Sequence, residues 1–247
     1  MLILLPPSES KRDGGGPDTR LRLAELGYRS LSAPRKQALT ALTSLAKDFT
    51  EMGRALKLGP RQHDELVRNR RVTRSPVIGA LDRYTGVLYE ALDATTLSPE
   101  ARQFAAGHLV IHSALFGLLR PDDPIPAYRL SSNSRLPGLS LHELWSAPIA
   151  AALAAQPGLI LDARSESYVK LGPTPPERSL FLRVVSEDNQ GRRRALNHFN
   201  KKGKGAFVRA LLRAGIDHAN ADSMVSWAAD AGITLSRRVP GEVELVV

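Results

Sequence analysis

The chain has 247 residues, with 34 Lys and Arg against 25 Asp and Glu, which gives a formal net charge of +9. With 43% hydrophobic and 24% charged residues it has the composition of a globular protein able to bury a core, which excludes disordered and fibrous classes. No apolar run approaches the roughly 20 residues that a bilayer requires, and residues 1–5 are too short for a signal peptide. We therefore predict a cytoplasmic protein with no membrane partner.

The residue types also limit the chemistry. The absence of cysteine excludes disulfides, thiolate metal sites, iron–sulfur clusters and cysteine nucleophiles. His108 and His112 have the spacing of an HExxH pair, but Leu109 stands where the glutamate belongs, which favours histidines of a core or sheet edge. We expect neither a bound metal nor a cofactor.

The N-terminal run predicts a buried strand followed by a loop. Residues 1–5 are continuously apolar and are ended by Pro6 and Pro7, as in a strand covered on both faces. Residues 8–16 then follow its carboxyl end, where ligands bind in open α/β sheets. The glycines of this loop match neither GxxxxGK[ST] nor GxGxxG, so a flexible loop is the alternative interpretation.

Residues 21–66 have a helical pattern that is interrupted at residues 55–61. Gly59 can end one helix and Pro60 can begin the next. Such a corner exposes backbone N–H groups that can hold a phosphate, although most corners of this kind only connect two helices.

Helix caps mark the middle of the chain. Ser98 predicts the start of a helix that Gly107 ends. Ser140 and Glu143 form a capping box, and Pro148 predicts the start of a second helix that ends near residue 158.

Two short apolar runs, residues 108–113 and 159–161, predict further strands. Asp162 follows the second run directly. A carboxylate at the end of a strand is a common catalytic group and also a common helix cap; the sequence favours the cap and leaves the catalytic interpretation open.

The last third of the chain predicts two hairpins and two helices. Residues 180–185 pair with 192–199, and residues 233–235 pair with 242–247. Helices are expected over residues 206–214 and 222–231. The order of elements predicts a mixed α/β (α+β) fold, a single domain over residues 1–247 with a central mixed sheet.

Basic residues gather in one segment. From Arg183 to Arg213 there are nine basic residues against two acids, a local net charge of +7. The 26 arginines against 8 lysines are typical of GC-rich genomes, so part of the total charge carries no functional message. A one-sign cluster predicts a polyanion site, and a merely solvated basic face is the alternative.

Five ordered blocks of the sequence resemble the YaaA family of peroxide stress proteins, the UPF0246 group of bacterial cytoplasmic proteins. The blocks are residues 1–8, 84–89, 113–130, 159–170 and 198–205. The third is the most specific, because it is close to the family pattern SGLYGLLRPLDxIxPYRLEM. Together the blocks span nearly the whole chain.

This resemblance implies one α/β domain with a basic cleft, a helix-hairpin-helix element, which we place at residues 56–61, and DNA binding linked to protection from peroxide. The residues expected to hold DNA phosphates are Lys57, Arg61, Arg120, Arg129, Lys170, Lys201, Lys202, Lys204, Arg209 and Arg213. With 5% aromatic residues, a stacking platform for single strands is disfavoured, so duplex or distorted duplex DNA is the expected partner.

Two alternatives remain open at this point. An enzyme acting on a nucleotide or nucleic acid would use Asp162 as a general base, with Tyr128 and Lys11 as acid, nucleophile or phosphate ligand. An iron-handling role is suggested only by the peroxide context of the family, and the six dispersed histidines give it little support.

Overall fold

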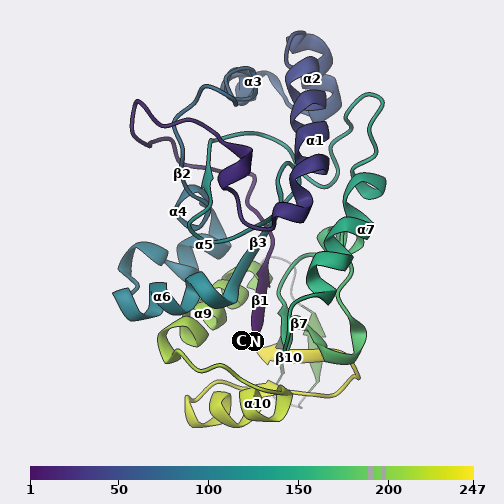
Figure 1. Cartoon of the computed structure of the whole chain (residues 1–247). Helices are drawn as coiled ribbons and strands as arrows, with labels where there is room; N and C mark the ends of the chain where they lie inside the picture. The colour runs from purple at the N-terminus through teal and green to yellow at the C-terminus, as the bar shows by residue number, and fades with distance from the viewer. Residues whose placement is uncertain (189–191, 196–198) are drawn as a thin grey trace.

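The computed structural model describes residues 1–188, 192–195 and 199–247 (Figure 1). Its main sheet is formed by β1 (Leu2–Leu5), β3 (Leu109–Ser113), β4 (Gly117–Leu119), β6 (Ile160–Asp162), β7 (Ser179–Glu187), β8 (Arg193–Ala195), β9 (Leu235–Ser236) and β10 (Glu242–Val246). The strand order is β4-β3-β1-β6-β7-β10-β9, with β8 on β7. A small second sheet pairs β2 (Ile78–Gly79) with β5 (Pro124–Ile125).

The middle of the main sheet is parallel and its edges are antiparallel. β1 pairs in parallel with β3 and β6, and the parallel pairing continues through β7 to β10. β4, β8 and β9 each run antiparallel to their neighbour. Every residue of β1 is buried, because helices cover both faces of the sheet around it. The mixed α/β fold and the buried first strand are therefore confirmed.

Ten α-helices accompany these strands within the described ranges. They are α1 (Ser32–Leu45), α2 (Phe49–Leu56), α3 (His63–Arg70), α4 (Ala80–Arg83), α5 (Val87–Leu92), α6 (Pro99–His108), α7 (Leu141–Ala154), α8 (Glu166–Lys170), α9 (Phe199–Ala214) and α10 (Ala221–Asp230). Short 3-10 turns lie at Leu23–Glu25, Arg29–Leu31, Pro60–Gln62, Ala94–Thr96 and Pro176–Arg178. None of the described helices is both long and apolar enough to cross a membrane.

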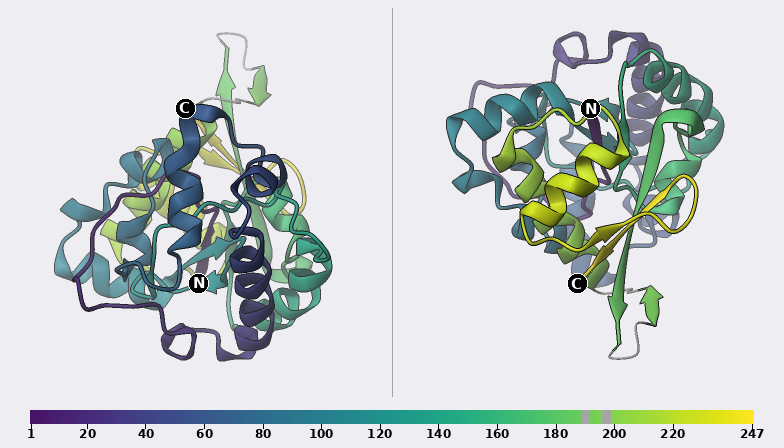
Figure 2. Two further views of the ribbon diagram at one scale, coloured as in Figure 1. Left: turned by 90° about the horizontal axis from the view of Figure 1, so that it is seen from above. Right: turned by 90° about the horizontal axis from the view of Figure 1, so that it is seen from below.

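The helices form two groups on either side of β1 (Figures 1 and 2). α1 and α7 pack together on one side, and α5, α6 and α9 pack together on the other. α2 and α3 lie beyond the carboxyl end of β1, whereas α10 and the N-terminus lie at the opposite end. The β7–β8 hairpin projects away from the body of the molecule (Figure 2).

Two boundaries predicted from glycine and proline are wrong. Pro148 does not begin a helix but lies inside α7, which Ser140 caps. Proline removes one backbone hydrogen bond there, and the buried stripe of Trp145, Ile149 and Leu153 offsets that loss.

The helix expected from residue 206 begins at Phe199 instead, so the lysine-rich segment is helical. Gly205 explains this difference, because a Cβ at that position would lie 2.1 Å from the carbonyl oxygen of Leu88. Glycine is thus required for the close contact between α9 and α5, and the packing of the two helices outweighs the low helix propensity of glycine.

Candidate functional site

A cavity of about 510 Å³ opens at the carboxyl ends of β1 and β6, and we call it the sheet-edge cavity. Its walls come from five segments that are distant in sequence. The lining residues are Pro6, Pro7, Ser8, Glu9 and Ser10 after β1, Gly86, Val87, Leu88 and Tyr89 at the start of α5, Leu130, Ser131, Ser132 and Asn133, Ala163, Ser165, Ser167 and Tyr168 after β6, and Asn200, Lys201 and Lys204 of α9.

The topology explains why these segments meet. β1 stops where Pro6 and Pro7 can no longer donate backbone hydrogen bonds, and β6 ends at Asp162. Because the two strands are parallel neighbours, the segments that leave them emerge at one edge of the sheet. The loop after β1 therefore lies where the sequence predicted a ligand-binding edge.

α9 presents its first two turns to the cavity. Lys201 and Lys202 are exposed, and neither forms an ion pair with any described residue. The N-terminal end of a helix adds partial positive charge, because its first backbone N–H groups have no partner in the helix. Asn200 also lines the cavity, and its buried Oδ1 atom accepts no hydrogen bond from the described residues. This end of α9 is therefore suited to an anion.

Lys204 differs from the two exposed lysines beside it. Only 5% of its surface is exposed, and its Nζ atom donates to the backbone oxygen of Arg164 at 3.1 Å. The same amine lies 4.9 Å from the centre of the Phe181 ring. Burial lowers the pKa of Lys204 to about 8.

A buried polar triad supports the wall that holds Lys204. The Asp162 carboxylate accepts from Arg164 through Nε at 2.8 Å and through Nη2 at 2.6 Å. The third nitrogen, Nη1, donates to Nδ1 of His112 at 2.9 Å, and burial lowers the pKa of this histidine well below its usual range, with Arg164 adding to the effect. Asp162 thus fixes Arg164, and the backbone oxygen of Arg164 in turn fixes the amine of Lys204.

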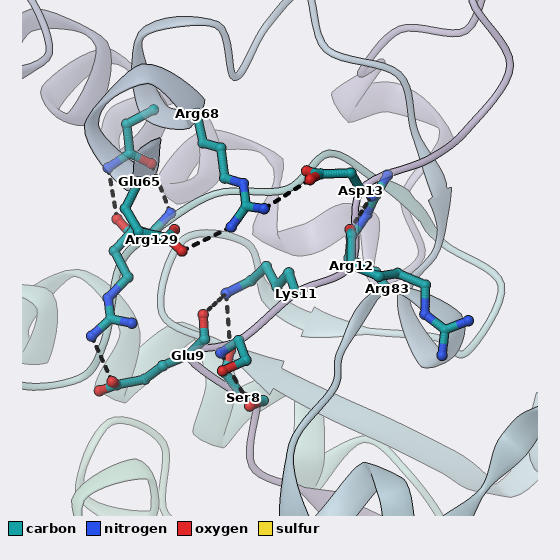
Figure 3. A network of polar contacts seen from close by, with 11 residues as sticks. Ser8, Glu9, Lys11, Arg12, Asp13, Glu65, Arg68, Arg83 and Arg129 are labelled. Carbon is teal, nitrogen blue, oxygen red and sulfur yellow. Dashed lines mark hydrogen bonds and ion pairs between the residues drawn. The ribbon is translucent and has the colours of Figure 1, made fainter. Parts of the chain in front are cut away.

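A second buried lysine, Lys11, lies in the loop that follows β1 (Figure 3). The Nζ atom of Lys11 donates to the backbone oxygens of Ser8 at 2.9 Å and Glu9 at 3.3 Å. It also lies 4.1 Å from the centre of the Tyr128 ring. Burial lowers the pKa of Lys11 to about 7, with Glu65 opposing the shift.

Tyr128 continues this cluster through a chain of hydroxyl groups. Its oxygen lies 2.7 Å from both the Tyr84 hydroxyl and the Ser113 Oγ atom, and burial raises the pKa of Tyr128 well above its usual range. The structure therefore brings Lys11 and Tyr128 together, two of the three residues considered for catalysis. Asp162, the third, makes its contacts with Arg164.

Comparison with known proteins agrees with the family resemblance seen in the five sequence blocks. The family model for peroxide stress protein YaaA matches residues 1–230. The chain belongs to the YaaA family.

Similar relatives carry the name UPF0246 protein. One from Corynebacterium efficiens is 38% identical over 242 residues, which cover 95% of this chain and 94% of the relative. One from Corynebacterium glutamicum is 37% identical over 240 residues, with 95% and 94% coverage, and one from Streptomyces coelicolor is 35% identical over 246 residues, with 98% and 94% coverage. The resemblance seen in the sequence is thereby confirmed.

The ten cations considered for phosphate binding in this YaaA-family chain are spread over several surfaces. Lys201 and Lys204 line the sheet-edge cavity, and Lys202 follows Lys201 on α9. Arg120 lines a different cavity of about 490 Å³, together with Tyr28. The exposed Lys57 and Arg61 lie at the α2–α3 corner, and Lys170 and Arg213 are exposed at the ends of α8 and α9.

Two of these arginines have structural partners. Arg129 forms an ion pair with Glu9 at 2.5 Å beside the sheet-edge cavity (Figure 3). Arg209 donates to the backbone oxygens of Leu92 and Asp93, which fastens α9 to the end of α5. Their charges are therefore engaged within the fold.

Sequence reasoning missed the carboxylates that form ion pairs with the arginines of the β7–β8 hairpin. Arg183 is bound by Glu242 at 2.6 Å, and Arg193 is bound by Glu244 at 2.8 Å. Both acids belong to β10, some fifty residues away in the chain. The alternation of two glutamates with valine and leucine in a terminal strand was the signal available, and it becomes useful only once β10 is known to pair with β7.

Proposed function

We propose that this YaaA-family protein binds DNA through its phosphate backbone at the sheet-edge cavity, as part of the peroxide stress response. The observation that carries the proposal is the first part of α9, where Lys201 and Lys202 are exposed beside a cavity and form no ion pair with an acid in the described part of the chain. Lysine side chains and helix N-termini are both regular ligands of phosphate oxygens.

The other residues of the cavity favour backbone recognition. Its walls carry six serines and two asparagines, which are typical partners of phosphate and sugar oxygens. The lining aromatics are Tyr89 and Tyr168, and both are buried, so they offer no open ring face on which a base could stack. Binding of this kind depends little on base sequence.

The α2–α3 corner offers a second contact for the DNA that the cavity binds. Lys57 ends α2 in the left-handed conformation, with φ of 55°, and Arg61 is exposed in the turn before α3. Both helices lie beyond the carboxyl end of β1, which is also the end of the sheet where the cavity opens (Figure 1). We assign this corner the role of the helix-hairpin-helix element that the family resemblance implies.

The test is a salt series of duplex binding measured by fluorescence anisotropy. A site that neutralises phosphates loses affinity linearly in log salt, with a slope of about 0.9 for each phosphate contact. The Lys201→Ala/Lys202→Ala double variant should therefore reduce the slope by about 1 to 2, with weaker binding at every salt concentration.

A charge-matched control keeps this result interpretable. Lys36 and Lys47 are also exposed lysines and line neither cavity, so Lys36→Ala/Lys47→Ala removes the same charge elsewhere. This control should retain the wild-type slope. Equal losses in both double variants, or binding that does not change with salt, would overturn the proposal.

A further inference from the structure

Lys204 is a cavity-lining lysine whose side chain is almost completely buried. It lines the sheet-edge cavity, yet 95% of its surface is covered, and its amine donates a hydrogen bond to the backbone oxygen of Arg164. No described carboxylate lies within ion-pair distance of the amine. Lys201, three residues earlier on the same helix, is exposed. The two lysines therefore lie in different environments.

Burial leaves the amine of Lys204 partly unprotonated at neutral pH. Asp162 and Glu166 raise its pKa and Arg183 lowers it, but burial is the largest influence and brings the pKa to about 8. At pH 7.5 about a quarter of such amines are neutral, compared with about 0.1% for a lysine of ordinary pKa. A neutral lysine amine in a desolvated pocket is the form that attacks carbonyl carbons.

We propose that Lys204 forms an imine with a sugar aldehyde that carries a phosphate, the group present both at an abasic site in DNA and in a free deoxyribose phosphate. The phosphate half of this inference rests on the proposed function. Residues three apart on a helix have side chains about 5–6 Å apart. Lys201 can thus hold the phosphate while Lys204 reaches the aldehyde of the same sugar.

The reaction needs no oxidant or reductant. The lone pair of Nζ attacks the aldehyde carbon, a carbon–nitrogen bond forms, and the carbonyl oxygen takes up a proton to give a carbinolamine. The carbon–oxygen bond then breaks, the hydroxyl group takes up the proton that the nitrogen gives up and leaves as water, and an imine remains. Ser165 and Ser167 line the same cavity, where their hydroxyl groups can bind the oxygens of the sugar.

Borohydride trapping tests this step on the full chain. The protein is incubated with a duplex carrying one abasic site or with 2-deoxyribose 5-phosphate, sodium borohydride is added, and intact mass and peptide mapping locate the adduct. We expect wild-type protein to be trapped at Lys204, and Lys204→Arg to lose at least ten-fold in trapping while it keeps its positive charge. Lys201→Arg should still be trapped.

The two substrates separate the sources of the aldehyde. Trapping of the abasic duplex supports a DNA substrate, whereas trapping of the free sugar phosphate without any duplex binding supports the imine and refutes the DNA-binding proposal. An adduct that maps to Lys11 or Lys201, or trapping that persists in Lys204→Arg, overturns the role of Lys204. Mapping on the wild-type chain decides this even if the variant fails to fold.

Discussion

The basic segment from Arg183 to Arg213 contains two regions that the sequence alone does not separate. In the β7–β8 hairpin, Arg183, Arg192 and Arg193 each meet a carboxylate, at 2.6, 3.1 and 2.5 Å. In the first part of α9, Lys201 and Lys202 meet none among the described residues. The formal charge of the segment is therefore a poor measure of the charge that a ligand can use. Cations that already hold an acid stabilise the fold, and those without one are available for binding.

Arg164 is the most deeply buried arginine with a carboxylate partner, and removing that partner should have the largest effect on the free energy of unfolding. Asp162 and Arg164 are both buried, and three hydrogen bonds join them, two from the guanidinium group and one from the backbone N–H of Arg164. Asp162→Asn keeps the shape of the side chain but leaves the guanidinium charge unpaired, which typically costs about 3–5 kcal/mol. Urea denaturation should show a loss of this size in the free energy of unfolding.

An exposed pair provides the matched control for that variant. Asp222 binds Arg237 at 2.9 Å, and its side chain is 86% exposed. Asp222→Asn should change the free energy of unfolding by less than about 0.5 kcal/mol. If the two variants lose equal free energy of unfolding, burial does not decide how much an arginine–carboxylate pair contributes to stability, contrary to our argument.

The pH dependence of stability should distinguish Lys204 from the exposed lysines. Its pKa is about 8 in the folded chain and has the ordinary value of 10.5 when unfolded. Between these values the unfolded chain binds more protons, so stability rises with pH over this window, by up to about 3 kcal/mol. The rise should be smaller in Lys204→Met, and urea denaturation at pH 8, 9 and 10 measures it.

Lys11 and Lys201 serve as comparisons for that measurement, one a second buried lysine and the other an exposed one. The pKa of Lys11 is lowered to about 7, so its contribution to stability should begin to rise about one pH unit earlier than that of Lys204. Lys201→Met removes an exposed lysine and should leave the pH profile parallel to that of the wild type. A Lys204→Met profile that is also parallel would contradict the burial of this amine.

Sequence reasoning located the strands and the sheet edge that carries the cavity because those signals are local. The apolar run before Pro6 and the run before Asp162 were enough to locate β1 and β6 and the edge where they end. The extent of α9 was not predictable, because Gly203 and Gly205 are typical of a loop. Only the structure shows that they fit against Val184 and Leu88. Helix propensity was overruled by tertiary packing.

The site was predictable in charge but not in role. The lysine block of α9 was identified as a basic region, yet its sequence does not distinguish the buried Lys204 from the exposed Lys201 and Lys202. The burial of Lys11 was equally invisible, since it depends on contacts with Tyr84 and Tyr128, more than seventy residues away. Local sequence carries the number of charges, whereas their pKa values and partners depend on distant segments.

A smaller effect than those of Asp162→Asn and Lys204→Met tests the comparison most directly. Arg193 donates to Glu244 at 2.8 Å and to Glu187 at 2.5 Å, and both Arg193 and Glu244 are largely shielded from solvent. Arg193→Ala should lower the free energy of unfolding by about 1–2 kcal/mol, because two carboxylates lose their partner. The salt slope of duplex binding should stay at the wild-type value, since this guanidinium is already neutralised. If the slope instead falls as far as in Lys201→Ala/Lys202→Ala, the hairpin pairs open on DNA, and the paired arginines belong to the binding surface after all.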